Sequence, residues 1–275
     1  MRKLGIIGAG LIGASIGRFY RKKCHVLCIG RNTKKLLFAK KLGCCDEFST
    51  DLKRVSECDF VVIATPVDTI VPIAKRVIPY MKKNTILIDV GSVKGEICKK
   101  ITPFARKYGV NFVGCHPMAG SEKSGAKFSR EDLFKGTTTI ITPEKKTKKD
   151  VILKVKNFWE KLGAKCVFEN PQKHDMILAF TSHLPHLISY SYSQAFLKKF
   201  GKDRNVRNFT AGSFTDMTRV SKSSPDVWSA IFKMNKNNLD KVLSDFQEQI
   251  AKISKEKSPE LKNTLKKIRN EIEKF

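Results

Sequence analysis

The stretch LGIIGAGLIG, residues 4–13, decides the fold of this chain. An apolar run with strand character leads directly into the spacing G-x-G-x-x-G, and the residues that follow read as a helix. In this setting Gly8 permits a tight turn, Gly10 lets the backbone approach a pyrophosphate, and Gly13 lets the helix pack on the strand. The N-terminus of that helix offers N–H donors to the phosphates. The stretch therefore predicts a Rossmann-type dinucleotide-binding fold.

Further apolar runs predict the other strands of a mostly parallel sheet. They lie at residues 24–29, 60–64, 85–90, 110–113, 137–142 and 164–168. Most are nearly continuous and rich in β-branched residues, as strands buried on both faces require, and helix-like stretches separate them. We therefore expect an α/β, doubly wound sheet of about seven or eight strands over residues 1–169.

From residue 170 onward the strand signals stop, and the chain reads as helices. Pro171 is typical of a first helical turn, and Pro259 predicts a break between the last two long helices. We expect residues 170–275 to form an all-helical domain.

The charge of the chain is strongly positive, with 53 Lys and Arg against 26 Asp and Glu, a net charge of +27. Such a field attracts polyanions, so a nucleic-acid-binding protein is a competing hypothesis. However, the lysines are spread along helix-like segments, and no nucleic-acid-binding motif is present. We expect solvated helix faces and no specific nucleic-acid partner.

Other features of the composition predict a cytoplasmic protein. The eight cysteines form no C-x-x-C pair, which favours reduced, mostly buried thiols. No apolar run reaches the roughly 18 residues of a membrane span. The N-terminal apolar run continues into the glycine-rich stretch without a site that resembles a signal-peptide cleavage site.

The end of the second predicted strand bears on the choice of cofactor. An NAD enzyme usually carries an acidic residue there, which binds the ribose 2′-hydroxyl. This chain has Gly30-Arg31-Asn32 instead, and an arginine can pair with a 2′-phosphate. We predict NADP in preference to NAD; in the alternative, Arg31 is a solvated loop residue and NAD is also used.

A second stretch, GCHPMAGSE at residues 114–122, contains the candidate catalytic base His116. It follows the apolar run at 110–113, and its small residues and proline are typical of a loop that lies close to a ligand. We expect His116 in such a loop, between a nicotinamide and a substrate. Cys115 should point to the opposite face, which argues against a Cys-His nucleophile pair.

These stretches resemble the prephenate/arogenate dehydrogenases of tyrosine biosynthesis, and the resemblance covers essentially the whole chain. The matching segments are GCHPMAGSEKSG (114–125), ATPV (64–67), DVGSVKG (89–95), HDMILAFTSHLPH (174–186), GSFTDMTR (212–219) and PDVW (225–228). Ser213 before Phe214 departs from the usual spacing of the family, which leaves the register near Thr215 open.

The resemblance implies a role for each candidate site residue. His116 would remove the proton of the substrate C4 hydroxyl, Ser92 would hydrogen-bond to the same hydroxyl, and Arg219 would bind a substrate carboxylate. A planar guanidinium suits that task because it binds a carboxylate through two parallel bonds. His186 would line the substrate pocket, and Glu122 would help to order it. Cofactor contacts are expected at Gly8, Gly10, Leu11, Ile12, Gly13, Arg31, Asn32, Thr65 and Pro66.

Some of these residues could instead have a purely structural role. Ser92 could cap the following helix, and Arg219 could be a surface residue in an ion pair. Asp216 is a candidate partner that orients Arg219. His183 and His186 share a helix face at i,i+3, but no nearby cluster supports a metal, so we expect none and assign His183 a structural role.

The resemblance implies an oxidoreductase that converts prephenate to 4-hydroxyphenylpyruvate, or arogenate to tyrosine. The reaction is an oxidative decarboxylation with hydride transfer to NADP, or alternatively NAD, in a homodimer. One alternative is another small Rossmann dehydrogenase with a helical second domain, such as a β-hydroxyacid dehydrogenase. Those enzymes do not have the GCHPMAG stretch paired with the SHLPH stretch that this chain contains. The other alternative is a cofactor-binding protein without turnover.

Overall fold

The computed structural model describes residues 1–119, 125–203 and 205–275. In this part of the chain eight strands form one sheet, in the order β3-β2-β1-β4-β5-β6-β7-β8. All neighbouring strands are parallel except β6 and β7. The strands are β1 (Lys3–Ile7), β2 (His25–Ile29), β3 (Glu47–Ser49), β4 (Phe60–Ile63), β5 (Ile86–Asp89), β6 (Asn111–Pro117), β7 (Thr138–Thr142) and β8 (Lys165–Phe168).

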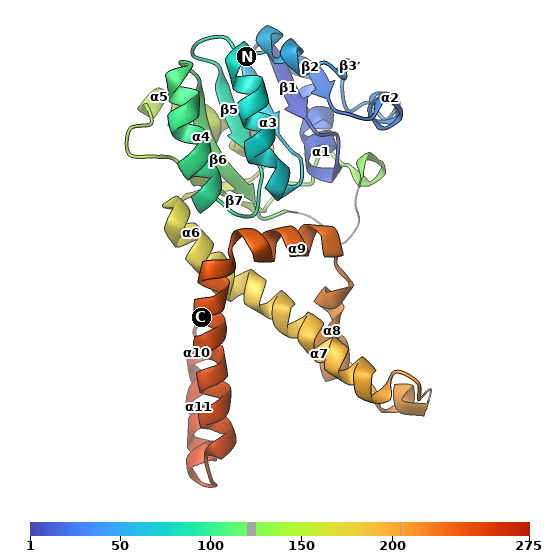
Figure 1. Cartoon of the computed structure of the whole chain (residues 1–275), viewed down its shortest axis with the longest axis vertical. Helices are drawn as coiled ribbons and strands as arrows, with labels where there is room; N and C mark the ends of the chain where they lie inside the picture. The colour runs from blue at the N-terminus through green and yellow to red at the C-terminus, as the bar shows by residue number, and fades with distance from the viewer. Residues whose placement is uncertain (120–124, 204) are drawn as a thin grey trace.

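Helices cover both faces of this sheet because its strands are apolar on both sides (Figure 1). On one face, Ile16 of α1 and Phe158 of α5 lie in the same core cluster as Val62 of the sheet. On the other face, α3 and α4 contribute to a second cluster. The helices of this half are α1 (Leu11–Tyr20), α2 (Thr33–Lys41), α3 (Ile70–Val77), α4 (Gly95–Lys107) and α5 (Lys149–Lys161). The predicted doubly wound α/β fold is confirmed.

Strand β6 differs from the sequence prediction. Residues 114–117 belong to the strand, whereas we expected a loop after residue 113. The reason is a change of partner within the strand. Its first residues pair with β5 in parallel up to Val113, and its last residues pair with β7 in antiparallel fashion, with His116 opposite Ile140. His116 is therefore fixed by a strand ladder.

The remainder of the chain is helical, as predicted. Its elements are α6 (Pro171–Leu178), the π-helical turn η5 (Ala179–His183), α7 (Leu184–Phe200), α8 (Gly212–Arg219), α9 (Pro225–Met234), α10 (Lys236–Lys255) and α11 (Glu260–Ile272). The predicted break at Pro259 is confirmed. Leu184 and Leu239 belong to a small core of this half, whereas Ile231 of α9 packs into the core of the sheet half. Figure 1 shows α9 lying across the end of the sheet half.

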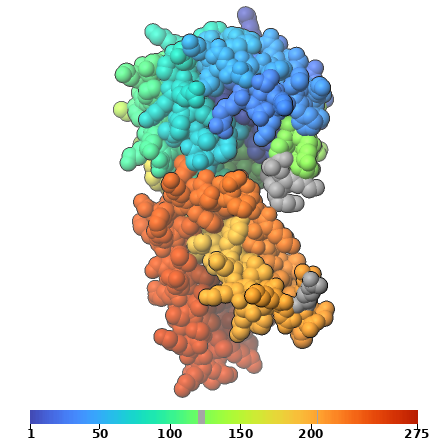
Figure 2. Space-filling view, turned by 45° about the vertical axis from the view of Figure 1, so that its right-hand side comes forward, coloured from blue at the N-terminus to red at the C-terminus, as the bar shows by residue number. Residues whose placement is uncertain are grey.

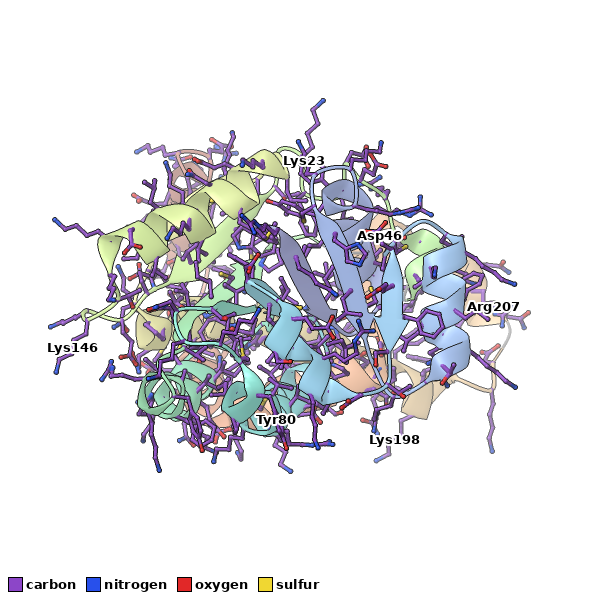
Figure 3. The ribbon with its side chains drawn as sticks, turned by 90° about the horizontal axis from the view of Figure 1, so that it is seen from above. Lys23, Asp46, Tyr80, Lys146, Lys198 and Arg207 are labelled. Carbon is purple, nitrogen blue, oxygen red and sulfur yellow. The ribbon has the colours of Figure 1, made fainter. Side chains whose placement is uncertain are left out.

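Several basic residues lie on the surface of the molecule. The two halves are stacked one above the other in Figure 2. Seen from above, Lys23, Lys146, Lys198 and Arg207 lie at the periphery, and all four are exposed (Figure 3). The cysteines are all free thiols, and all but Cys24 and Cys166 are buried. No helix of the described residues has the length and apolar character needed to cross a membrane.

Candidate active site

The turn between β1 and α1 has the backbone geometry that a bound pyrophosphate requires. Gly8 has a φ of +102°, and a Cβ there would lie 2.5 Å from the carbonyl oxygen of Ala64. A Cβ on Gly13 would lie 2.1 Å from the carbonyl oxygen of Gly8, so only glycine lets α1 pack this closely. At Gly10 a Cβ would meet no atom within 4 Å. The turn is therefore tight where it packs and open where a ligand would approach.

The N-terminus of α1 has no capping side chain in the described part of the chain. Gly10 is the N-cap residue, and the first turn holds no acidic side chain. The backbone N–H groups that follow, at Leu11 and Ile12, therefore remain available to an anion at the positive end of the helix. This arrangement fits the pyrophosphate of a dinucleotide cofactor.

The other predicted cofactor contacts lie at the ends of β2 and β4. Arg31 is exposed, and the side-chain oxygen of Asn32 accepts a hydrogen bond from the backbone N–H of Lys35 at 3.0 Å, which caps α2. Thr65 is partly buried, and its hydroxyl lies 2.8 Å from that of Thr69. Pro66 is exposed. These ends are on the edge of the sheet where ligands of open α/β folds bind.

His116 is buried between the two halves of the molecule and is only 8% exposed. Its Nδ1 lies 2.9 Å from Nε2 of His174 on α6. Nδ1 of His174 in turn lies 2.8 Å from Oδ1 of Asp175. The Asp175 carboxylate accepts hydrogen bonds from the backbone N–H groups of Lys94 and Gly95, each at 2.7 Å. A continuous chain of polar groups thus links β6, α6 and the start of α4.

Burial lowers the pKa of His116 well below its usual value near 6.5. The proximity of His174, Lys94 and His183 lowers this pKa further, because each disfavours a second positive charge. The imidazole is therefore neutral near pH 7. A neutral imidazole is the state that a general base requires.

A fully buried ion pair lies beside His116. Nζ of Lys94 contacts the carboxylate of Asp89 and donates a hydrogen bond to the carbonyl oxygen of Cys115 at 2.9 Å. Both side chains are 0% exposed. Because the pair ties the end of β5 to the residue before His116, it fixes the backbone on which the imidazole is mounted. Cys115 itself points into the core, where burial raises the pKa of its thiol, so it is not a nucleophile.

Ser92 lies between β5 and α4 and is partly exposed. The simpler interpretation of this residue as a helix cap is wrong, because the N-cap of α4 is Lys94. The carboxylate of Asp175, from the helical half, binds the first N–H groups of that helix instead. Within the described residues the Ser92 hydroxyl makes no hydrogen bond, which leaves it available to a substrate hydroxyl.

His186 and Arg219 come together in the helical half. Nδ1–H of His186 donates to the carbonyl oxygen of Ser182 at 2.9 Å, and the ring stacks on Trp228 with centroids 3.4 Å apart. Partial burial lowers the pKa of His186, and the nearby charge of Arg219 lowers it further. Arg219 is exposed at the end of α8, and neither it nor Asp216 forms an ion pair within the described residues. The suggested pairing of these two residues is therefore not observed.

His183 is buried at 1% exposure, and its Nδ1 lies 3.0 Å from Nδ2 of Asn235. Burial lowers the pKa of His183 to about 4. The same amide group of Asn235 donates to the carbonyl oxygen of Asp175 at 2.8 Å. His183 thus contacts the scaffold of the site, consistent with the structural role assigned to it. Glu122, predicted to order the site, lies outside the described residues.

Comparison with known proteins gives two matching family models, described as the nucleotide-binding domain and the dimerization domain of prephenate dehydrogenase. The first matches residues 16–168 and the second residues 170–270. The chain belongs to the prephenate dehydrogenase family. The resemblance noted in the sequence is confirmed.

Relatives of this prephenate dehydrogenase-family chain match over most of its length. It is 34% identical to the prephenate dehydrogenase of Bacillus subtilis, over 91% of this chain and 68% of the relative. It is 32% identical to the cyclohexadienyl dehydrogenase of Zymomonas mobilis, over 92% of this chain and 87% of the relative. A crystal structure of Aquifex aeolicus prephenate dehydrogenase with hydroxyphenyl propionate and NAD+ has a TM-score of 0.92 at 31% identity, covering 100% of this chain and 98% of that one.

Sequence reasoning had assigned no role to two residues of this family member, His174 and Asp175. Both belong to the segment that resembles the family, at its start, whereas the predicted roles fall on His183 and His186 near its end. The available signal was an adjacent His-Asp pair directly after a predicted helix start. Only the fold brings that pair to His116, which is 58 residues earlier in the chain.

Proposed function

We propose that this chain catalyses the oxidative decarboxylation of prephenate or arogenate, with hydride transfer to a nicotinamide cofactor, in tyrosine biosynthesis. The observation that carries the proposal is His116, a neutral buried imidazole between the dinucleotide-binding turn and the helical half. Membership of the prephenate dehydrogenase family supports the reaction. The names of the Bacillus and Zymomonas relatives support a cyclohexadienyl substrate.

The roles of the individual residues follow from this reaction. The bound cofactor supplies the hydride acceptor. His116 takes the proton of the substrate C4 hydroxyl on Nε2 as the C4 carbon is oxidised, and Ser92 holds the same hydroxyl. Arg219 binds a substrate carboxylate and His186 lines the side-chain end. The backbone N–H groups of Leu11, Ile12 and Gly13 hold the pyrophosphate.

The division of labour between the halves is also a proposal. Residues 1–169 would bind the dinucleotide, and residues 170–275 would bind the substrate and form a homodimer. The match to a dimerization domain over residues 170–270 supports the second part. We further propose that the enzyme works in the cytoplasm, on a small-molecule substrate and without a nucleic-acid partner.

The test is the absorbance of reduced nicotinamide with prephenate or arogenate crossed with NADP or NAD. We expect turnover in at least one of the four combinations and none with a simple β-hydroxyacid as control. Folded protein that binds a dinucleotide but turns over no combination would refute the proposal in favour of a cofactor-binding protein. Retention on a polyanion resin at moderate salt would favour nucleic-acid binding, since nonspecific attraction fades steeply.

We propose NADP as the preferred cofactor, and Arg31 as the residue that selects it. The solved Aquifex structure contains NAD+, which supports a nicotinamide cofactor for this family. The preference for the phosphorylated form depends on Arg31, exposed at the end of β2, where no acidic residue occupies the ribose position.

Arg31→Asp should lower the ratio of kcat/KM for NADP over that for NAD by about 10- to 30-fold. A hydrogen bond to a charged group contributes about 1.5–3 kcal/mol, and the aspartate would repel the 2′-phosphate. The measurement is initial rates with each cofactor at saturating substrate. Arg76→Asp, an exposed arginine in the last turn of α3, is the matched control and should leave the ratio unchanged. A wild-type preference for NAD would contradict the assignment.

A further inference from the structure

Three buried side chains form an unbranched hydrogen-bonded chain that ends at His116. The side chain of His174 is 0% exposed and that of Asp175 is 6% exposed. The two imidazole rings meet edge to face, with centroids 5.1 Å apart. Since solvent barely reaches these groups, the donor and acceptor of each bond are set by the protein itself.

The position of each proton can be assigned from the Asp175 end. A backbone N–H can only donate, so the two N–H groups of Lys94 and Gly95 require the Asp175 oxygens to accept. His174 therefore donates its Nδ1–H to Oδ1 of Asp175, which makes its Nε2 the hydrogen-bond acceptor of the ring. His116 must then donate its own Nδ1–H to that nitrogen, which leaves Nε2 of His116 without a proton.

We propose that His174 and Asp175 are positioning residues that hold His116 in the tautomer with an unprotonated Nε2, the atom that takes the substrate proton. This inference rests on the proposed function for its catalytic part, whereas the tautomer is a property of the protein alone. The arrangement has the logic of a Ser-His-Asp triad, in which a carboxylate fixes the tautomer of the base.

The proposed proton transfer needs no reactant besides the substrate, the hydride-accepting cofactor and His116. As hydride leaves C4, the O–H bond breaks, its electron pair stays on oxygen to form the carbonyl, and the proton bonds to Nε2 of His116. The resulting imidazolium keeps its Nδ1–H bond to His174, whose Nδ1–H faces the Asp175 carboxylate. Loss of carbon dioxide returns electrons to the same oxygen, which takes the proton back as the ring becomes aromatic. The charge is therefore transient.

The surroundings hold the chain of groups rigidly. The Asp175 carboxylate binds the start of α4, while Nδ2 of Asn235 binds the Asp175 backbone carbonyl oxygen at 2.8 Å. Asn235 is 3% exposed and lies between α9 and α10. Two segments, one from each half, thus fix Asp175, which in turn fixes His174.

The first measurement is nitrogen NMR of the histidine rings in the full-length protein with bound cofactor. We expect His116 to carry its proton on Nδ1 in the wild type and to lose this single tautomer in His174→Asn. The control is His25→Asn, which removes an exposed histidine at the start of β2 and should retain the Nδ1–H tautomer of His116. A wild-type His116 with its proton on Nε2 would overturn the assignment, whether or not the enzyme turns over prephenate.

The second measurement is the pH dependence of turnover. His174→Asn should lower kcat about 10- to 50-fold with KM little changed, since the base is then often in the wrong tautomer. Its acid limb should move to higher pH, because His174, whose proximity lowers the pKa of His116, is then absent. Asp175→Asn should also lower kcat, because His174 then loses the acceptor of its Nδ1–H, and it provides a second variant if one of them folds poorly. A wild-type kcat and pH profile in a folded variant would refute the catalytic role.

Discussion

His116→Asn is expected to lower kcat by about 10²- to 10⁴-fold, the usual contribution of a positioned acid–base group. Asparagine can still occupy the site on β6 and can hydrogen-bond to a substrate hydroxyl, but it cannot take a proton. Binding of cofactor and substrate should therefore change little. The measurement is kcat at saturating substrate, with cofactor binding followed separately. His25→Asn, an exposed histidine at the start of β2, is the matched control.

The same side chain should set the acid limb of the pH profile. Burial lowers the pKa of His116, so the neutral form persists at pH values where an ordinary histidine is already protonated. We expect kcat/KM to stay level down to about pH 6.5 and to fall only below it. The limb should be absent from the residual activity of His116→Asn. Near-normal turnover of this variant would remove His116 from the reaction.

Arg219→Gln is expected to raise KM by about 50- to 200-fold and to change kcat much less. The guanidinium can bind a carboxylate through two charge-assisted bonds, and each such bond contributes about 1.5–3 kcal/mol. Glutamine keeps one donor group, but it loses the positive charge and the two parallel N–H donors of the guanidinium. The location of Arg219 supports the assignment, since it lies near His186 and has no acidic partner within the described part of the chain. Steady-state kinetics with varied substrate give both constants.

Arg207→Gln provides the control for this prediction. Arg207 is an exposed arginine of the same half, at the periphery of the molecule in Figure 3. Its removal lowers the net charge equally, so any general effect of the positive field on an anionic substrate appears in both variants. An unchanged KM in Arg219→Gln, or an equal rise in both variants, would refute a specific carboxylate site.

Much of the fold could be predicted because its signals are local. The spacing of Gly8, Gly10 and Gly13 after an apolar run is determined by sterics within one turn. The structure gives Gly8 and Gly13 the close contacts, and Gly10 the open space, that the spacing implies. The partner change in β6 could not be predicted, because it depends on β7, which begins 21 residues after Pro117. Only that pairing makes residues 114–117 a strand.

The site residues that lie within recognisable sequence motifs could be predicted. The contacts that form only when the fold brings distant segments together could not. His116, His186 and Arg219 stand in segments that resemble a family. The capping of α4 by Asp175 involves residues 80 positions apart, and no local pattern distinguishes it from the expected cap by Ser92. The role of His174 was missed for the same reason, since it follows from the position of Asp175.

The bond between Asp175 and α4 has a consequence for recombination between relatives. A chimera that joins the dinucleotide half of one enzyme to the helical half of another must carry an acidic side chain at this position. Without it, the first turn of α4 would lack its anion and His116 would lack a defined proton position, even if every residue around the cofactor were retained. Whether two halves from different enzymes fit together therefore depends on the contact between them. In this chain that contact is made by the Asp175 carboxylate and the backbone amides of Lys94 and Gly95.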